Sequence, residues 1–207
     1  NAPALASVAT IEGKDNVFQM CFTDPGQGAK SAEYISEQGL GEKIAIIWKN
    51  DDVYSKGIRD TFVEEAAARS LAIVSETTFN DSNATDFSVQ VSSAQESGAD
   101  LVFLPIYYEP AALIFAQASS VGYAPKWFGV DGMDGILTLK GFDASLAEGV
   151  MLLTPFNADA TDEDIWLALD MSCCRGLVEA MPEGLDAVLT SAGANLSQGQ
   201  RQLLAIA

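Results

Sequence analysis

The stretch KIAIIWKNDDVYSKGIRDTFVEEAAARS, residues 43–70, shows the clearest pattern of a strand followed by a helix. Its first part, Lys43–Trp48, is a short apolar run of the kind found in buried strands. A helix is predicted over Ser55–Ser70, because apolar side chains recur there on one face, at Ile58, Phe62 and Ala66. A buried strand followed by an amphipathic helix indicates a βαβ unit.

The same alternation continues outward from this stretch to about Phe156. Further strands are predicted at Ala72–Phe79, Leu101–Pro105, Lys126–Val130 and Val150–Thr154. Further helices are predicted at about Ala29–Gln38, after a loop at Thr23–Gly28, and at Phe87–Ser97 and Glu109–Val121. Strands that alternate with helices predict an α/β fold with a doubly wound, mainly parallel sheet.

Some details of these helices are also predicted. Asp86 is the expected N-cap of one helix, and Gly98 and Gly122 stand where left-handed C-caps are common. Leu113 and Ala116 are expected to face the sheet.

The loops at the carboxyl ends of the strands are the expected ligand-binding regions, because open α/β sheets bind ligands there. They are Asn50–Ser55, Ile106–Pro110 and Asp131–Gly135. Their aromatic and acidic side chains include Tyr54, Tyr107, Tyr108, Asp131 and Asp134. An acid/base pair of Asp131 and Asp134 is an alternative, although nothing else in that loop indicates a reaction.

Composition argues against several classes of function. The formal net charge of −18 disfavours binding to nucleic acid or an anionic membrane, since such affinity comes mainly from Lys and Arg. The absence of His excludes imidazole catalysis and His-ligated metal sites, and no metal, cofactor or enzymatic activity is predicted. Without an apolar run of about 18 residues no membrane insertion is expected, and Asn1–Ser7 lack the features of a signal peptide.

The pattern changes at about Ala158, which predicts a second part. From Asp162 we expect an acidic-started helix, a helical piece near Gly176–Ala180 and, after a Gly/Ser/Asn loop, a helix over Ser197–Ala207 capped by Ser197. The predicted division is an α/β domain over residues 1–158 and a helical segment over residues 159–207.

Four stretches of the first part are jointly specific: TDPGQG at 23–28, KIAIIWKNDDVYSKGI at 43–58, DFSVQVSSAQESGADLVFLPIYYEPAALIFAQASSVG at 86–122 and FGVDG at 128–132. Together they resemble the second lobe of leucine/isoleucine/valine-type periplasmic binding proteins of ABC importers. The resemblance implies one lobe with a flavodoxin-like strand order, an extracytoplasmic location, an amino-acid ligand and an ABC transporter membrane complex as partner.

The resemblance also implies that Tyr54, Tyr107 and Asp131 face the ligand. A carboxylate can accept a charge-assisted hydrogen bond from an α-ammonium group, and phenol rings supply contact area. The alternatives are that Asp131 is a helix N-cap ahead of Gly132 and that the tyrosines are ordinary aromatics at the rim of the sheet.

The sequence departs from that family in one large respect. Nearly all of the first lobe, which holds the ligand carboxylate, is absent, and Asn1–Leu5 is similar only to its last loop. We therefore expect weak or lost ligand binding. The apolar surface left by the missing lobe could also favour a homodimer.

The second part contains Leu196-Ser197-Gln198-Gly199-Gln200, an LSxGQ motif with PEGLD upstream. Residues 162–207 resemble the helical subdomain and signature helix of an exporter-type ABC ATPase, in which Ser197, Gly199 and Gln200 would lie at a nucleotide phosphate. We expect this site to be inactive. The nearest P-loop candidate, Gly26–Ser31, has Ala29 where a Gly is required.

The two resemblances imply opposite sides of a membrane, so we interpret the chain as a chimera joined near residues 158–162. The predicted function is an amino-acid-binding lobe without catalysis. The alternatives are a chimeric fragment with no activity and an ATPase-related nucleotide-binding fragment.

Overall fold

A computed structural model of the chain describes residues 23–154, 161–188, 196, 197, 199, 200 and 204. The chain separates into two compact units, Asn1–Pro155 and Phe156–Ala207. The predicted boundary after Ala158 lies outside the described residues, as does the predicted loop at Asn1–Leu5.

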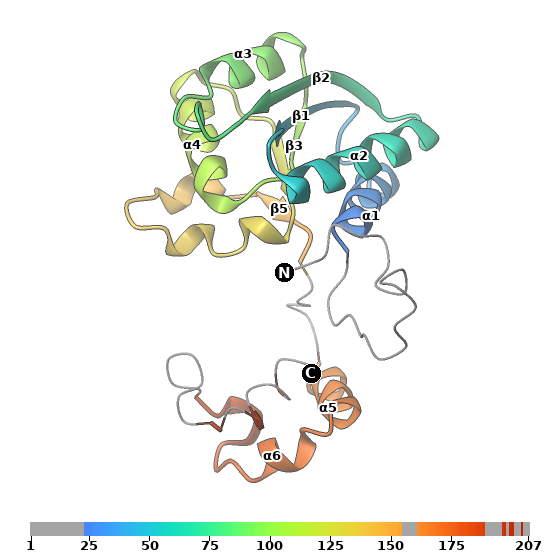
Figure 1. Cartoon of the computed structure of the whole chain (residues 1–207), viewed down its shortest axis with the longest axis vertical. Coiled ribbons are helices and arrows are strands. Elements are labelled where there is room, and N and C mark those ends of the chain that lie inside the picture. The colour runs from blue at the N-terminus through green and yellow to red at the C-terminus, as the bar shows by residue number, and fades with distance from the viewer. Residues whose placement is uncertain (1–22, 155–160, 189–195, 198, 201–203, 205–207) are drawn as a thin grey trace. The chain divides into compact units, whose positions relative to one another are not determined.

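The first unit alternates helices and strands as the sequence predicts (Figure 1). Its main elements are α1 (Asp24–Glu37), β1 (Lys43–Lys49), α2 (Val53–Ala68), β2 (Ala72–Phe79), α3 (Ser88–Glu96), β3 (Leu101–Leu104), α4 (Tyr108–Ser120), β4 (Lys126–Gly129) and β5 (Met151–Leu152). Three short 3₁₀ turns stand between β4 and β5: η2 (Asp131–Met133), η3 (Ile136–Thr138) and η4 (Ala144–Ala147).

The strands form a 5-stranded sheet in the order β2-β1-β3-β4-β5, and every pairing is parallel. This is the flavodoxin-like order, which confirms the predicted doubly wound fold. The last strand is shorter than the predicted Val150–Thr154.

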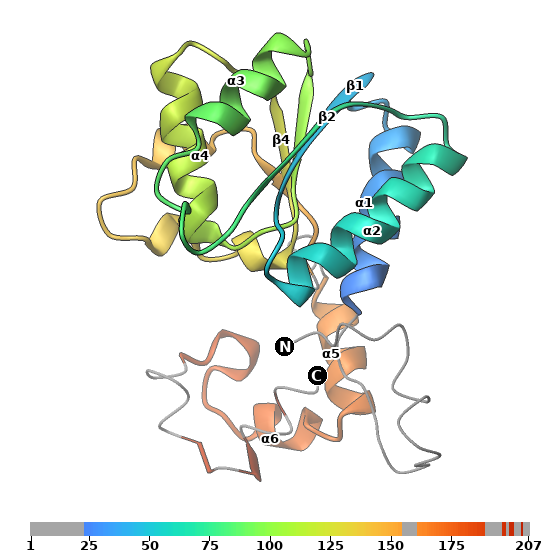
Figure 2. The same ribbon diagram turned by 45° about the horizontal axis from the view of Figure 1, so that its top comes forward.

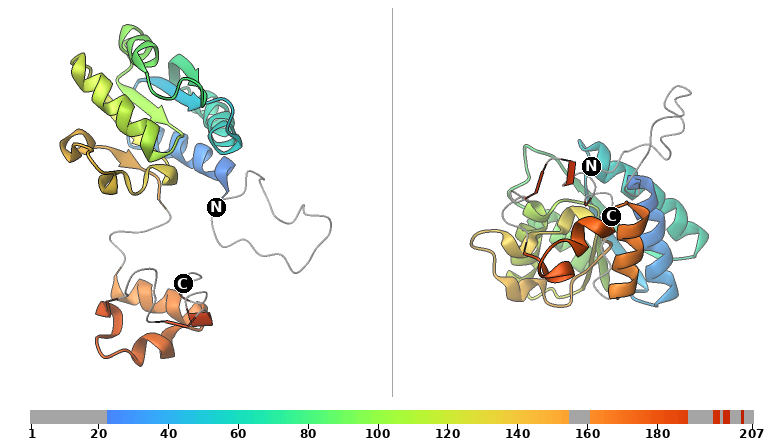
Figure 3. Two further views of the ribbon diagram at one scale, coloured as in Figure 1. Left: turned by 60° about the vertical axis from the view of Figure 1, so that its left-hand side comes forward. Right: turned by 90° about the horizontal axis from the view of Figure 1, so that it is seen from below.

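Two pairs of helices cover the sheet. Helices α1 and α2 lie on one face and α3 and α4 on the other, as Figure 2 and the left view of Figure 3 show. Within β1, Ile44 and Ile46 pack toward the first pair, while Ala45 and Ile47 pack toward the second. Because both faces are covered, these strands read as continuous apolar runs.

Helix α1 begins earlier than predicted, so the expected loop at Thr23–Gly28 is wrong. Thr23 is the N-cap, and its Oγ1 accepts a hydrogen bond of 3.0 Å from the Gly26 N–H. Pro25 lies in the first turn, where its missing N–H costs no intrahelical bond. The Gly- and Pro-rich sequence is therefore compatible with a helix start.

A glycine sets how closely α1 approaches α2. A Cβ atom at Gly28 would stand 2.0 Å from the carbonyl oxygen of Ile58 and 2.3 Å from Oγ1 of Thr61. The Thr61 hydroxyl also donates to the Pro25 carbonyl oxygen at 2.7 Å. The backbones of the two helices are thus in direct contact at this point.

The prediction for the buried face of α4 is wrong by one position. Leu113 is 41% exposed and Ala116 is also exposed. The buried residues are Ala111, Ala112, Ile114, Phe115 and Ala118. Four of them follow i, i+3, i+4 and i+7 spacing from Ala111, which is one helical face and leaves Leu113 beside it.

The predicted helix ends are confirmed only in part. Gly98 and Gly122 have the expected left-handed φ of 71° and 70°. The N-cap of α3 is Phe87 rather than Asp86, although Asp86 Oδ1 still accepts a hydrogen bond of 2.9 Å from the Ser88 N–H.

The second unit is small and helical among its described residues, with α5 (Asp162–Met171), α6 (Arg175–Glu179) and the turn η5 (Gly184–Asp186). Thr161 and Asp164 form a capping box at the start of α5. Leu169, Cys174 and Val178 form a buried cluster.

In the part of the chain that the structure describes, none of the helices is both long and apolar enough to cross a membrane.

Candidate functional site

The three predicted site residues come from three loops at the carboxyl edge of the sheet. Tyr54 lies in the first turn of α2, after β1. Tyr107 is the N-cap residue of α4, after β3, and Asp131 opens η2, after β4. Strands β1 and β3 are neighbours whose following helices cover opposite faces, so the loops meet at the switch point where such sheets bind ligands.

The structure brings these three residues together. The Tyr54 hydroxyl donates to Asp131 Oδ1 at 2.5 Å and accepts from the Gly132 N–H at 2.9 Å. The Tyr54 and Tyr107 rings stack with their centroids 4.7 Å apart and an interplanar angle of 22°. Burial, followed by the hydrogen bond to Asp131, raises the pKa of Tyr54, so its phenol stays protonated and donates.

Gly132 makes this close arrangement possible. A Cβ atom there would stand 2.6 Å from the Tyr54 hydroxyl oxygen and 3.1 Å from Cδ1 of Tyr107. Any larger side chain would push the two rings away from the Asp131 loop.

The other two loop residues do not join the cluster. Tyr108 packs against the core on the α3 and α4 side of the sheet. Asp134 is exposed, and its N–H donates to the Asp131 carbonyl oxygen at 2.9 Å. The described contacts thus give no support to the acid/base pair considered from the sequence.

Helix α1 adds two residues that the sequence reasoning missed. Oε1 of Gln27 accepts a hydrogen bond of 3.2 Å from the Asp131 N–H, and Gln27 is fully buried. Asp24 is only 2% exposed. Asp24 Oδ1 and Gln27 Nε2 are buried without a hydrogen-bond partner among the described residues. The loop predicted at Thr23–Gly28 is in fact the first turn of α1, so the sequence pattern does not reveal these two residues.

The charge around Tyr107 is negative. Burial, followed by the charges of Asp52, Asp24 and Asp131, raises the pKa of Tyr107. Burial and then repulsion from Asp131 and Asp52 raise the pKa of Asp24 to about 6. Asp52 also caps α2, accepting from the N–H groups of Tyr54 and Ser55 at 3.4 Å. A cationic group would relieve this repulsion and satisfy the buried oxygen of Asp24.

The signature-like residues of the second unit have an internal role. The Gln200 N–H donates to Ser197 Oγ at 3.2 Å, and the Ser197 N–H donates to Gln200 Oε1 at 2.8 Å. This reciprocal pair is a capping box, and Gly199 is helical beside it. The P-loop candidate Gly26–Ser31 lies inside α1.

Comparison with known proteins gives three findings that concern a binding-protein fold. The model of the family described as "Periplasmic binding protein" matches residues 2–171. The Leu/Ile/Val-binding protein homolog 3 from Brucella melitensis is 27% identical over 126 residues, which are 60% of this chain and 33% of that protein. An ABC transporter substrate-binding protein from Desulfitobacterium hafniense, solved in complex with Leu, is 25% identical to this chain and superposes with a TM-score of 0.60. The match covers 98% of this chain and 59% of that protein's chain.

A further solved structure supports the fold alone. The branched-chain amino acid transporter substrate-binding protein LivJ from Streptococcus pneumoniae, in complex with isoleucine, has a TM-score of 0.66 at 24% identity, covering 86% of this chain and 49% of its own. The chain therefore spans about half the length of these structures.

A second group of relatives matches over short segments. The ATP-binding cassette transporter abc2 from Schizosaccharomyces pombe is 46% identical over 67 residues, which are 32% of this chain and 4% of that protein.

Proposed function

Because the chain belongs to the periplasmic binding protein family, we propose that its α/β unit is a solute-binding lobe that holds an amino acid through the ligand's ammonium group. The observation that carries the proposal is the pairing of Asp131 with the Tyr54 hydroxyl across the switch point of the sheet. The names of similar proteins that include leucine, isoleucine and valine support an amino-acid ligand.

In this proposal Asp131 is the main partner of the ammonium group. Tyr54 donates to its Oδ1, and no described residue donates to its other oxygen, which is left for the ligand. Gln27 holds the backbone of Asp131 in place. Asp24 supplies a second carboxylate, and Tyr54 and Tyr107 supply a stacked aromatic wall. Such a site fits a small cation with an apolar part.

A single lobe is expected to bind weakly. Closed ligand pockets bury roughly 70 to 90% of a ligand, and one lobe offers only part of that contact. If about half of a micromolar binding energy of −8 kcal/mol remains, the dissociation constant is on the order of millimolar. Binding measurements therefore need millimolar ligand.

Replacing Asp131 by asparagine is expected to weaken leucine binding by about tenfold to hundredfold, since it removes the charge from a hydrogen bond to an ammonium group. The measurement is an NMR or calorimetric titration of the full chain with L-leucine. Asp134→Asn is the matched control, because Asp134 is exposed on the same loop. Equal affinities of wild type and Asp131→Asn would contradict the proposal, as would absence of leucine binding at tens of millimolar.

Membership of the family also supports a location outside the cytoplasm and a role beside the membrane components of an ABC transporter. In that role the lobe delivers solute and performs no chemistry.

We also propose that the chain joins two unrelated pieces, a binding-protein lobe and a segment of an ABC ATPase. The short ATP-binding cassette matches and the LSQGQ motif support this. The family model, however, extends to residue 171 and so includes α5, which the sequence assigned to the second piece. Sequencing of the genomic region is expected to show a rearrangement between Asn157 and Met171, and an intact gene recurring with the same junction would refute it.

A further inference from the structure

A cavity of about 270 Å³ adjoins Tyr107 at the carboxyl edge of the sheet, beside the proposed ammonium site. Tyr107 lines it and stacks on Tyr54, so the same ring borders both regions. Its volume equals roughly nine water molecules at their share of liquid volume, and it approaches the size of small-molecule pockets. The cavity therefore shares one aromatic wall, the Tyr107 ring, with the proposed ammonium site.

The inner wall of this cavity is apolar. Phe79 and Ile106, each 1% exposed, line it, together with Pro110 and the exposed Leu113. Leu113 can line the cavity because it lies beside the buried face of α4 and not on it. This wall suits a chain of methylene groups.

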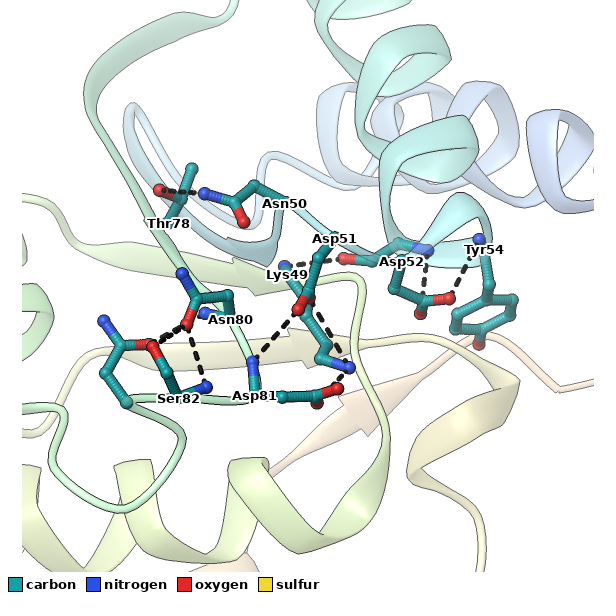
Figure 4. A network of polar contacts seen from close by, with 11 residues as sticks. Lys49, Asn50, Asp51, Asp52, Tyr54, Thr78, Asn80, Asp81 and Ser82 are labelled. Carbon is teal, nitrogen blue, oxygen red and sulfur yellow. Dashed lines mark hydrogen bonds and ion pairs between the residues drawn. The ribbon is translucent and has the colours of Figure 1, made fainter.

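The remaining walls are charged, with one ammonium group and three carboxylates: Lys49, Asp52, Asp81 and Glu109. Lys49 is already paired, since its Nζ lies 2.6 Å from Asp81 Oδ1 and 3.5 Å from Asp51 Oδ1 (Figure 4). The hydrogen bond to Asp81 raises the pKa of Lys49, which keeps it charged. Lys49 is thus not available to a ligand carboxylate.

Glu109 is the charged group of the cavity whose side chain has no partner among the described residues. It is exposed in the first turn of α4, and no hydrogen bond or ion pair of the described residues involves its carboxylate. The cavity consequently combines an apolar wall with an unpaired carboxylate at its edge.

We propose that this cavity receives the side chain of the bound amino acid and selects a long aliphatic side chain that ends in a cation, as in lysine or ornithine. This inference rests on the proposed function, because it needs an ammonium group at Asp131 to direct the side chain past Tyr107. The proposed ligand differs from the branched aliphatic amino acids in the names of similar proteins.

The test compares L-lysine with L-norleucine, which has the same number of side-chain carbons but no terminal ammonium. Full-length chain is titrated with each at about 150 mM salt, so that the acidic surface is screened beyond about 8 Å. We expect lysine to bind about threefold to fivefold more tightly than norleucine, and Glu109→Gln to remove that preference without weakening norleucine. Glu64→Gln is the matched control, because Glu64 is also an exposed carboxylate but lies on α2, and this variant is expected to leave the preference unchanged.

The outcomes separate this inference from the proposed function. If leucine and norleucine bind in an Asp131-dependent manner but lysine binds no more tightly, the inference is wrong and the proposed function stands. The inference is also wrong if Glu109→Gln and Glu64→Gln reduce lysine binding equally, because the preference then comes from overall charge. Absence of binding by all three amino acids contradicts both.

Discussion

Replacing Gly28 by alanine is expected to lower the free energy of unfolding by about 3 kcal/mol, the upper range for overpacking a close-packed site. The added methyl would meet the Ile58 carbonyl oxygen at 2.0 Å and Thr61 Oγ1 at 2.3 Å. A backbone carbonyl cannot rotate away, so α1 and α2 must separate. The gain of about 1 kcal/mol from alanine's helix propensity does not offset this. Urea denaturation followed by far-UV circular dichroism measures the change.

The matched control is Gly57→Ala on α2. A Cβ atom there meets only Cβ of Asp24, at 3.9 Å, which is an ordinary contact. This variant is expected to be more stable than wild type by about 0.5 to 1 kcal/mol, because only the propensity changes. If both variants change stability in the same direction, that result would contradict the close backbone contact of α1 with α2 at Gly28.

Replacing Asp24 by asparagine is expected to stabilise the protein at pH 8 by up to about 3 kcal/mol, since each pKa unit corresponds to about 1.4 kcal/mol. Burial and the charges of Asp131 and Asp52 raise the pKa of Asp24 from 3.8 to about 6. A raised pKa means that the folded state resists ionisation. The contribution of Asp24 to the stability of the wild type is therefore fully present below about pH 4, and it is lost as the pH rises to about 6.

The measurement is the free energy of unfolding of wild type and Asp24→Asn between pH 3.5 and pH 8, with the pH range set by these pKa values (about 4 to 6). The difference should be near zero at the acidic end and grow across pH 4 to 6. Asp134→Asn, at an exposed carboxylate, should show no such growth. A difference that is independent of pH would contradict the buried, charge-repelled environment of Asp24.

Asp24 destabilises the fold at neutral pH, but the same carboxylate can contribute to ligand binding. A ligand ammonium group beside Asp24 and Asp131 would lower the repulsion between them. We therefore expect Asp24→Asn to be more stable than wild type and also to bind leucine less tightly, which is the usual opposition between stability and function at a site.

The fold could be predicted because its signals are local. Apolar runs such as Lys43–Trp48 and Leu101–Pro105 have the length of strands, and the Ile58, Phe62 and Ala66 face of α2 has helical spacing. The errors arose where local signals conflict. Gly and Pro in Thr23–Gly28 suggested a loop, but Thr23 caps a helix there. In α4 residues 110–116 are all apolar, so the sequence could not fix the buried face.

The site could be predicted less completely. Position after a strand predicts a group of five loop residues, and the family resemblance selects Tyr54, Tyr107 and Asp131 from it. The structure brings these three together, and their role as ligand contacts stays a prediction. Asp24 and Gln27 could not be found in this way, since they lie on a helix that precedes the first strand of the sheet. Burial of a polar side chain is a tertiary property that no single-sequence pattern shows.

The hydrogen bond between Tyr54 and Asp131 joins residues 77 positions apart, across two complete βαβ crossovers. Contacts of such separation are slow to form, because closing a long loop costs chain entropy. During synthesis the site cannot exist until β4 and its following turn have left the ribosome and docked. A ligand that recognises this site should accordingly leave the folding rate almost unchanged and slow unfolding instead.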